Sequence, residues 1–155
     1  MDSNSVIELP ELNFPEKYHF RLRKTDHYLQ IFCPVRKKWF QNTAEEWVRQ
    51  HSIQFLHKEF QYPLSSIVAE FPVQINYLHQ RADIIVLKQE KPWILTECKK
   101  PEIPINQTIL DQAMRYAQQI GCTFIFLTNG IQHIYCHLDH ENKKISFIEK
   151  LPSYQ

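Results

Sequence analysis

Two apolar runs separated by a short charged stretch constrain the fold of this chain more than any other feature. They are ADIIVLK, residues 82–88, and PWILTECK, residues 92–99, and QEK joins them. Each run is nearly continuous in apolar residues and too short for a typical buried helix, so each predicts a β-strand buried on both faces. Such a strand needs a packed layer on either side of its sheet. The sequence therefore predicts an α/β fold.

Two further segments have the residue spacing of amphipathic helices. Thr43 followed by Glu46 is a capping-box pattern, which predicts a helix over about residues 44–60. The second helix is predicted over residues 106–121, where Gly121 stands at the position that commonly ends a helix. The residues expected to face the core from the first helix are Trp47, Val48, Phe55, Leu56 and Phe60.

The remaining segments predict irregular chain and strands. Residues 1–18 show no clear period, and residues 28–40 predict one or two short strands around Pro34. The later strands are residues 66–77, interrupted at Pro72; residues 123–130 and 131–138, a hairpin around Asn129 and Gly130; and residues 143–151, an edge strand. We expect a single domain over residues 1–155, an α/β sandwich whose mixed central sheet is flanked by helices.

The composition excludes several classes of protein. No stretch approaches the roughly 18 consecutive apolar residues of a membrane span, so we expect a cytoplasmic protein without a membrane partner. The chain has only two glycines, which excludes a phosphate-binding P-loop and a dinucleotide-binding fingerprint, and any nucleotide-driven motor is expected on another chain. The four cysteines are widely spaced in apolar segments and are expected to be reduced and buried.

Basic residues gather in the first forty positions, where acidic residues are few. They are Lys17, Arg21, Arg23, Lys24, Arg36, Lys37 and Lys38. Two interpretations stay open: a surface that meets phosphate groups, or an ordinary solvated face.

Charged residues lie at the ends of the two central runs. If the runs form an antiparallel hairpin centred on Glu90, Leu87 faces Trp93 and Asp83 faces Glu97. Residues directly opposed across two strands have Cβ atoms about 5 Å apart, so the two carboxylates would nearly touch. Two like charges at that distance need a neutralising partner.

Lys99 shares a strand face with Glu97, because side chains alternate, while Cys98 points to the other face. Asp83, Glu97 and Lys99 are therefore expected to converge. Two carboxylates are hard oxygen ligands of the kind that Mg²⁺ prefers, and a neighbouring lysine can orient water and stabilise charge on a phosphoryl group. The alternative is that Asp83 ends a strand while Glu97 and Lys99 form a surface ion pair, as a one-residue shift in the turn would produce.

An acid at the start of one strand, followed by Glu-X-Lys at the end of the next, resembles the PD-(D/E)XK nuclease superfamily, with Ala82 in place of the first proline. Five ordered segments are more closely similar to the N-terminal nuclease domain of type I restriction enzyme R subunits: EEWVRQ, RADIIVL, ECKKPEIP, LDQAMRY and LTNG. The similarity covers about residues 36–138 and leaves residues 1–35 as an N-terminal extension. It implies a restriction-endonuclease-like sandwich. The helicase motor to which such domains are usually fused is expected on another chain.

The resemblance implies hydrolysis of DNA phosphodiester bonds with Mg²⁺ or Mn²⁺ in a restriction or defence context. It implies that Asp83, Glu97 and the backbone carbonyl of Cys98 bind the metal and that Lys99 is the catalytic lysine. The implied partners are DNA and a separate motor or methyltransferase subunit. The alternative is a non-catalytic module on the same fold that binds nucleic acid or docks on another chain.

Further site residues follow from the same resemblance. Gln112 and Tyr116 match a Gln-X-X-X-Tyr element of some nucleases in the superfamily, and at a spacing of one helical turn both can reach a substrate backbone. The alternative is two exposed polar residues on an amphipathic helix. Glu46 matches a first-helix acid that approaches the metal in relatives, but the capping box accounts for it equally well, and Glu45 is the second choice.

Other residues are assigned from their positions in the predicted strands. The residue types of a zinc site are His133, Cys136, His137 and His140. We do not expect such a site, because Cys136 points away from the face that His133 and His137 share. Glu70 is either a supporting acid or an exposed strand residue. Three tryptophans are expected in the core, the alternative being platforms on which bases stack: Trp39, Trp47 and Trp93.

Overall fold

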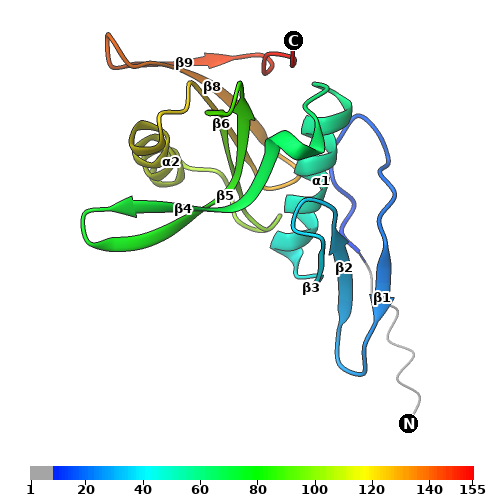
Figure 1. Cartoon of the computed structure of the whole chain (residues 1–155). Helices are drawn as coiled ribbons and strands as arrows, with labels where there is room; N and C mark the ends of the chain where they lie inside the picture. The colour runs from blue at the N-terminus through cyan, green and yellow to red at the C-terminus, as the bar shows by residue number, and fades with distance from the viewer. Residues whose placement is uncertain (1–8) are drawn as a thin grey trace.

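The computed structural model describes residues 9–155. Residues 9–18 have no regular secondary structure, as the sequence predicts, and the first part of that predicted irregular segment, residues 1–8, lies outside the described residues. The rest of the chain folds into two sheets and two α-helices (Figure 1).

A mixed six-stranded sheet forms the centre of the molecule. Its strands lie in the order β4 (Ile67–Ile75), β5 (Leu78–Lys88), β6 (Lys91–Cys98), β7 (Phe124–Thr128), β8 (His133–Asp139) and β9 (Lys144–Ile148). All neighbouring pairs are antiparallel except β6 and β7, which are parallel and are connected by the helix α2 (Gln107–Ile120). The predicted α/β sandwich with a mixed central sheet is confirmed.

The two faces of this sheet pack against different helices. The helix α1 (Ala44–Lys58) and α2 lie on opposite sides of the sheet (Figure 1). On β5, Ile84 and Val86 belong to the core on the α1 side, whereas Ile85 between them belongs to the core on the α2 side. All three side chains are fully buried. The central strands are therefore buried on both faces, as their continuous apolar character predicts.

Both predicted helices form, and their ends lie within two residues of the predicted positions. The Thr43 hydroxyl accepts the N–H of Glu46 and caps α1. Asn106 caps α2, and Gly121 ends it with a φ of 93°, in the left-handed region that favours glycine. The five residues expected to face the core from α1 are all buried.

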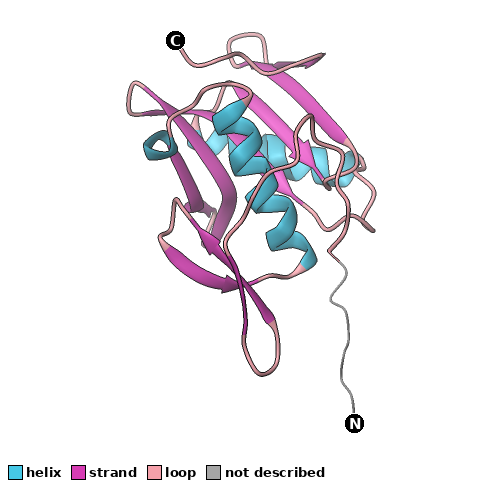
Figure 2. Cartoon of the chain, turned by 90° about the vertical axis from the view of Figure 1, so that its right-hand side faces the viewer, coloured by secondary structure: helices cyan, strands magenta, loops and turns pink. Residues whose placement is uncertain are grey.

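A separate antiparallel sheet precedes α1. Its strands are β1 (Leu22–Lys24), β2 (Leu29–Cys33) and β3 (Lys38–Gln41). The sheet lies beside α1, and the turn between β1 and β2 projects from the body of the molecule (Figure 2). The sequence did not predict β1, because all three of its side chains are exposed and its residues do not alternate between polar and apolar.

The strand β4 continues through Pro72, where the sequence predicts an interruption. This prediction was wrong because β4 is an edge strand, where a residue without an N–H is tolerated. The irregularity lies instead at Glu70, which stands opposite Asp83 in the register of β4 and β5. Its φ of 59° is uncommon for a residue other than glycine.

The pairing of β5 with β6 agrees with the predicted register at one end and differs at the other. Ile85 faces Leu95 as predicted, but the register shifts between Val86 and Leu87, so that Leu87 faces Pro92 instead of Trp93. The reason is the turn: Gln89 and Glu90 both have positive φ and form a tight two-residue connection. The shift lies on the turn side of Ile85, so the predicted register is retained toward Asp83.

The three tryptophans have different environments. Trp47 is buried, and Trp93 is half-buried against the core on the α1 side. Trp39 is half-buried on the outer face of the small sheet and belongs to neither core cluster, so its assignment to the core was wrong. Among the described residues, no helix has the length and apolar character needed to cross a membrane.

Candidate active site

The charged residues at the ends of β5 and β6 meet in one pocket. Asp83 lies on β5, Glu97 lies on β6, and Lys99 follows the end of β6. All three line a cavity of about 160 Å³ on the α2 side of the sheet. The other lining residues are Glu45, Arg81, Ile109, Gln112, Ala113 and Tyr116. The predicted convergence of the three charges is thus present in the structure, and their chemical roles stay predictions.

Backbone hydrogen bonds hold the two carboxylates in place. The N–H of Cys98 donates to Asp83 Oδ2 at 2.8 Å, and the N–H of Asp83 lies 3.4 Å from Glu97 Oε1. Burial and the neighbouring Asp83 carboxylate raise the pKa of Glu97 well above its usual value. Burial and Asp83 also raise the pKa of Glu45. The pocket therefore concentrates negative charge that a bound cation would neutralise.

The donor atoms in this pocket fit a hard divalent cation. Asp83 and Glu97 offer carboxylate oxygens from adjacent strands, which suits Mg²⁺. Within residues 9–155, no three His, Cys, Asp or Glu side chains come together as a ready metal cage. A cation held by two carboxylates would keep several waters, as Mg²⁺ usually does in proteins.

Gln112 and Tyr116 of α2 reach the same pocket and are linked to each other. The Gln112 amide donates to the Tyr116 hydroxyl at 2.9 Å, and that hydroxyl lies 3.3 Å from Gln80 Oε1 on β5. Tyr116 is only 5% exposed, so it is not the solvated residue of the alternative interpretation, whereas Gln112 is exposed. The pair joins α2 to β5 at the rim of the site.

Glu46 does not join the other candidate ligands. Both of its carboxylate oxygens accept from Arg36 at 2.7 Å, and one also lies 3.5 Å from Arg49. The structure therefore disagrees with the expectation that Glu46 approaches the metal, because two arginines already neutralise its charge. Glu45, the second choice, lines the pocket instead. No contact bears on the predicted role of the Cys98 carbonyl.

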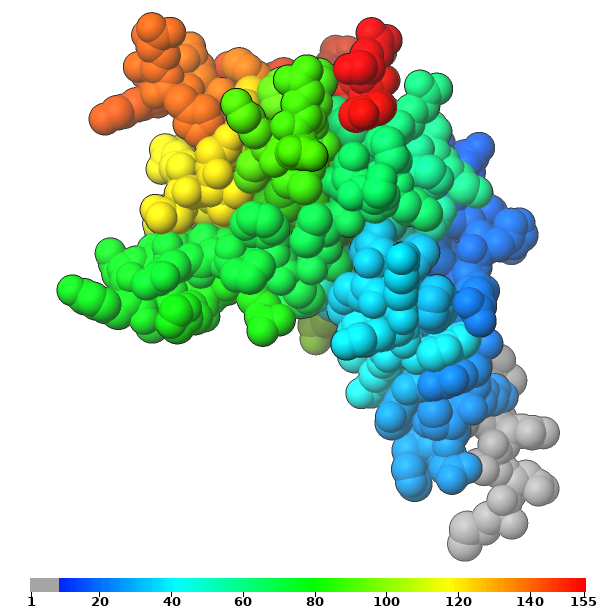
Figure 3. All heavy atoms as spheres, in the orientation of Figure 1, coloured from blue at the N-terminus to red at the C-terminus, as the bar shows by residue number. Residues whose placement is uncertain are grey.

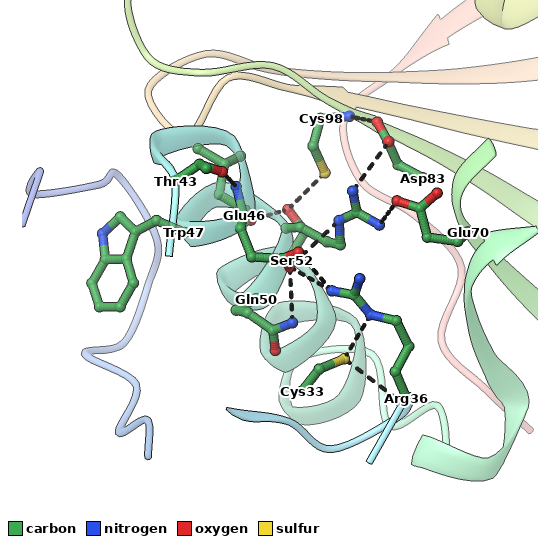
Figure 4. A network of polar contacts seen from close by, with 12 residues as sticks. Cys33, Arg36, Thr43, Glu46, Trp47, Gln50, Ser52, Glu70, Asp83 and Cys98 are labelled. Carbon is green, nitrogen blue, oxygen red and sulfur yellow. Dashed lines mark hydrogen bonds and ion pairs between the residues drawn. The ribbon is translucent and has the colours of Figure 1, made fainter. Parts of the chain in front are cut away.

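A buried ionic network lies behind the pocket. Arg49 of α1 donates to Glu70 and lies 3.7 Å from Asp83 Oδ1, and it also contacts Glu46. Burial by itself would lower the pKa of Arg49, but the neighbouring acids, among them Glu46, Asp83 and Glu70, together raise it above its usual value. Figure 4 shows the network extending from Cys98 and Asp83 to Arg36 and Cys33.

Arg49 was not among the predicted site residues, although one signal for it was present in the sequence. Glu46 and Arg49 are three residues apart on α1, which is the spacing of an ion pair on one helix face. Glu70 forms an ion pair with Arg49, and its predicted role as a supporting acid stays a prediction. Asp83 is consequently held from two sides, by a backbone N–H and by a guanidinium group.

The candidate zinc residues serve other contacts. His133 bonds the Thr128 hydroxyl and the carbonyl of Asn13, His140 bonds the carbonyl of Cys122, and Cys136 is buried in the core on the α2 side. No zinc arrangement forms among residues 9–155.

The raised pKa of Glu97 predicts how stability depends on pH. Between 4.5, the usual value for a glutamate, and the higher pKa in the folded state, the folded protein holds more protons than the unfolded chain. Without divalent metal, the free energy of unfolding should therefore fall as pH rises through this window. Glu97→Gln should show a smaller fall, measured by denaturant unfolding at several pH values.

The control for this prediction is Glu149→Gln, because Glu149 is exposed. In this variant the free energy of unfolding should fall with rising pH as much as it does in the parent protein. If the free energy of unfolding falls equally with rising pH in Glu97→Gln and in the parent, burial and the Asp83 carboxylate do not disfavour ionisation of Glu97.

Comparisons with known proteins show the family of the domain that contains this pocket. A search of curated proteins found no match. The family model of the type I restriction enzyme R protein N terminus matches residues 44–152. This range includes both α-helices, the whole six-stranded sheet and every residue that lines the pocket, whereas the three-stranded sheet lies outside it. The chain therefore belongs to the family of the type I restriction enzyme R protein N terminus.

Proposed function

We propose that this domain hydrolyses DNA phosphodiester bonds in a reaction that depends on Mg²⁺ or Mn²⁺, within a restriction or defence system. The observation that carries the proposal is the pocket in which Asp83, Glu97 and Lys99 meet. Membership of the family supports the restriction context.

The carboxylates of the pocket would bind the divalent cation. Asp83, Glu97 and the carbonyl of Cys98 would bind it, and the bound ion supplies Lewis acidity and lowers the pKa of water. Arg49 and the N–H of Cys98 keep the Asp83 carboxylate in one orientation. A fixed carboxylate loses little freedom when substrate arrives, which favours catalysis.

Lys99 and the residues of α2 act on the substrate. The ammonium group of Lys99 orients the attacking water and stabilises the negative charge on the phosphoryl oxygens. Water attacks phosphorus and gives up a proton to solvent, the bond from phosphorus to the leaving oxygen breaks, and that oxygen takes up a proton from solvent. Gln112 and Tyr116 position the DNA backbone. For this, the Gln112 amide donates to a phosphate oxygen in place of the Tyr116 hydroxyl.

The protein is proposed to act with other subunits in the cytoplasm. DNA is the substrate, and a separate motor or methyltransferase subunit delivers it, as the restriction context suggests. The four cysteines are buried free thiols, which fits a reducing cytoplasm.

Incubation of purified protein with supercoiled plasmid tests the activity. We expect nicking or linearisation with Mg²⁺ or Mn²⁺ and none after addition of a chelator. Asp83→Asn should be inactive, whereas the matched variant Asp111→Asn should remain active, because Asp111 is exposed on α2 and does not line the pocket.

Thermal melting during a Mg²⁺ titration separates the enzyme from a non-catalytic module. The parent should gain up to about 2.7 kcal/mol when free metal reaches about one hundred times its dissociation constant, and Asp83→Asn should gain little. Metal-dependent stabilisation without cleavage would identify a binding module. Absence of both results would refute the proposed metal site.

A further inference from the structure

The outer face of the three-stranded sheet carries a distinctive set of side chains. In the register of β1, β2 and β3, Arg21 stands beside Phe32 and Trp39, and Arg23 stands beside Gln30 and Gln41. Because side chains alternate along strands, these six residues share one face, here called the outer face. The opposite face carries the buried residues Ile31 and Cys33 and packs toward α1.

The aromatic rings of the outer face support both arginines. The guanidinium of Arg21 lies 4.5 Å from the ring centre of Phe32 and 5.3 Å from that of Trp39. The guanidinium of Arg23 lies 4.3 Å from the Trp39 ring, and its Nε donates to Gln30 at 2.6 Å. The two rings pack edge to face at 5.5 Å. The guanidinium groups are therefore held by the sheet beneath them.

Positive charge on this sheet is not neutralised by neighbouring acids. Within residues 9–155, neither Arg21 nor Arg23 forms an ion pair, and the same is true of Lys24, Lys37 and Lys38. All five side chains are exposed. A surface of this kind attracts polyanions, and its attraction depends on salt.

From this geometry we infer that the outer face binds the phosphodiester backbone of DNA. The inference rests on the proposed function only for the choice of DNA as the polyanion. Guanidinium groups that stack on aromatic rings direct their N–H bonds outward along the plane of the group, which matches the geometry of phosphate oxygens. Arg21 directly precedes β1 and Arg23 lies on it, so two residues of extended chain, about 7 Å, separate them, which is close to the separation of neighbouring phosphates on one DNA strand.

The position of the outer face relative to the pocket supports this choice. The strand β3 ends at Gln41, and Glu45, which lines the pocket, lies in the first turn of α1. Figure 3 shows the sheet and the β4–β5 hairpin projecting from the body in different directions. The small sheet lies outside the range matched by the family model, residues 44–152.

Equilibrium binding to a short fluorescein-labelled DNA duplex in chelator, where no cleavage occurs, tests the inference. Arg21→Gln/Arg23→Gln should weaken binding by roughly 10- to 100-fold and lower the slope of log affinity against log salt by about 1.8, which corresponds to two phosphates. Arg21→Lys/Arg23→Lys keeps both charges but lacks the planar group, and it should bind several-fold more weakly than the parent. Thermal melting verifies that each variant folds.

The matched control is Lys91→Gln/Lys144→Gln, which removes two exposed charges from the central sheet. This variant should bind within about twofold of the parent at moderate salt. Equal weakening by the control and the arginine variant would overturn the inference, as would unchanged affinity of either arginine variant. Displacement of DNA by poly-glutamate at equal charge concentration would also overturn it, in favour of an acidic protein partner. If the arginine variant loses affinity while the parent never cleaves DNA, the outer face stands and the proposed activity fails.

Discussion

Replacing Lys99 with alanine is expected to lower the rate of DNA cleavage by about 10²- to 10³-fold, the cost of removing one group that stabilises developing charge. The thermal midpoint of unfolding should remain nearly unchanged. The backbone N–H of Lys99 donates to Thr128 at 2.9 Å, and an alanine retains that bond. Within the described residues the Lys99 side chain forms no ion pair, so its removal breaks no direct contact with a carboxylate.

Lys100→Ala is the matched control for this variant. Lys100 is the next residue, is exposed and does not line the pocket. Initial rates of plasmid nicking at saturating metal compare the two variants with the parent. Equal loss in both variants would show a general effect of charge on DNA binding, and full activity of Lys99→Ala would exclude Lys99 from the chemistry.

Replacing Arg49 with methionine is expected to lower the free energy of unfolding by about 3 to 5 kcal/mol, the usual cost of removing one partner from a buried ion pair. The Arg49 side chain is only 8% exposed, and its guanidinium contacts Glu46, Glu70 and Asp83. Methionine fills similar space but leaves these carboxylates without that cation. Denaturant unfolding at neutral pH measures the difference.

The pH dependence of the same variant provides an internal check. Without Arg49, the three carboxylates lack a shared cation, so the loss of stability relative to the parent should be smaller at acidic pH, where carboxylates in general carry less charge. Arg115→Met is the control, because Arg115 is exposed on α2 and forms no ion pair within the described residues. A loss below about 1 kcal/mol, as is typical of exposed pairs, would contradict the view that the network supports the site.

Arg49→Met should also reduce cleavage in conditions where the protein remains folded. Arg49 acts through Asp83, since it lies beside Oδ1 while the N–H of Cys98 holds Oδ2. A positioning role predicts that the variant needs more Mg²⁺ for half-maximal activity. A purely structural role would leave that requirement unchanged in the folded fraction.

The helices and the central strands could be predicted from the sequence because each has a local pattern. The apolar runs of β5 and β6 predicted burial on both faces, and alternation predicted that Glu97 and Lys99 share a face. The register around Ile85 agrees with the predicted one because the shift between Val86 and Leu87 offsets the shorter turn. These properties depend on backbone geometry over a few residues, so neighbouring residues are sufficient to specify them.

Other features had no local pattern. The strand β1 is short and exposed, and Trp39 faces outward although a tryptophan suggests a core position. The capping box predicted that Glu46 belongs to the start of α1, which is correct, but its carboxylate contacts Arg36 and Arg49 instead of the site. Each of these outcomes depends on what lies across the fold.

Local sequence patterns specified the two helices, the central strands, their order in the chain and the strand face that Glu97 and Lys99 share. The partners of the charged residues depend on the tertiary structure. Arg49 and Glu70 are 21 residues apart, and Arg49 meets Glu70 and Asp83 only after α1 packs on the sheet. Which carboxylate remains available to bind a metal depends on these long-range pairings. Glu46 and Glu45 are adjacent in sequence, yet one is neutralised by arginines and the other lines the pocket, because successive helical residues point in different directions.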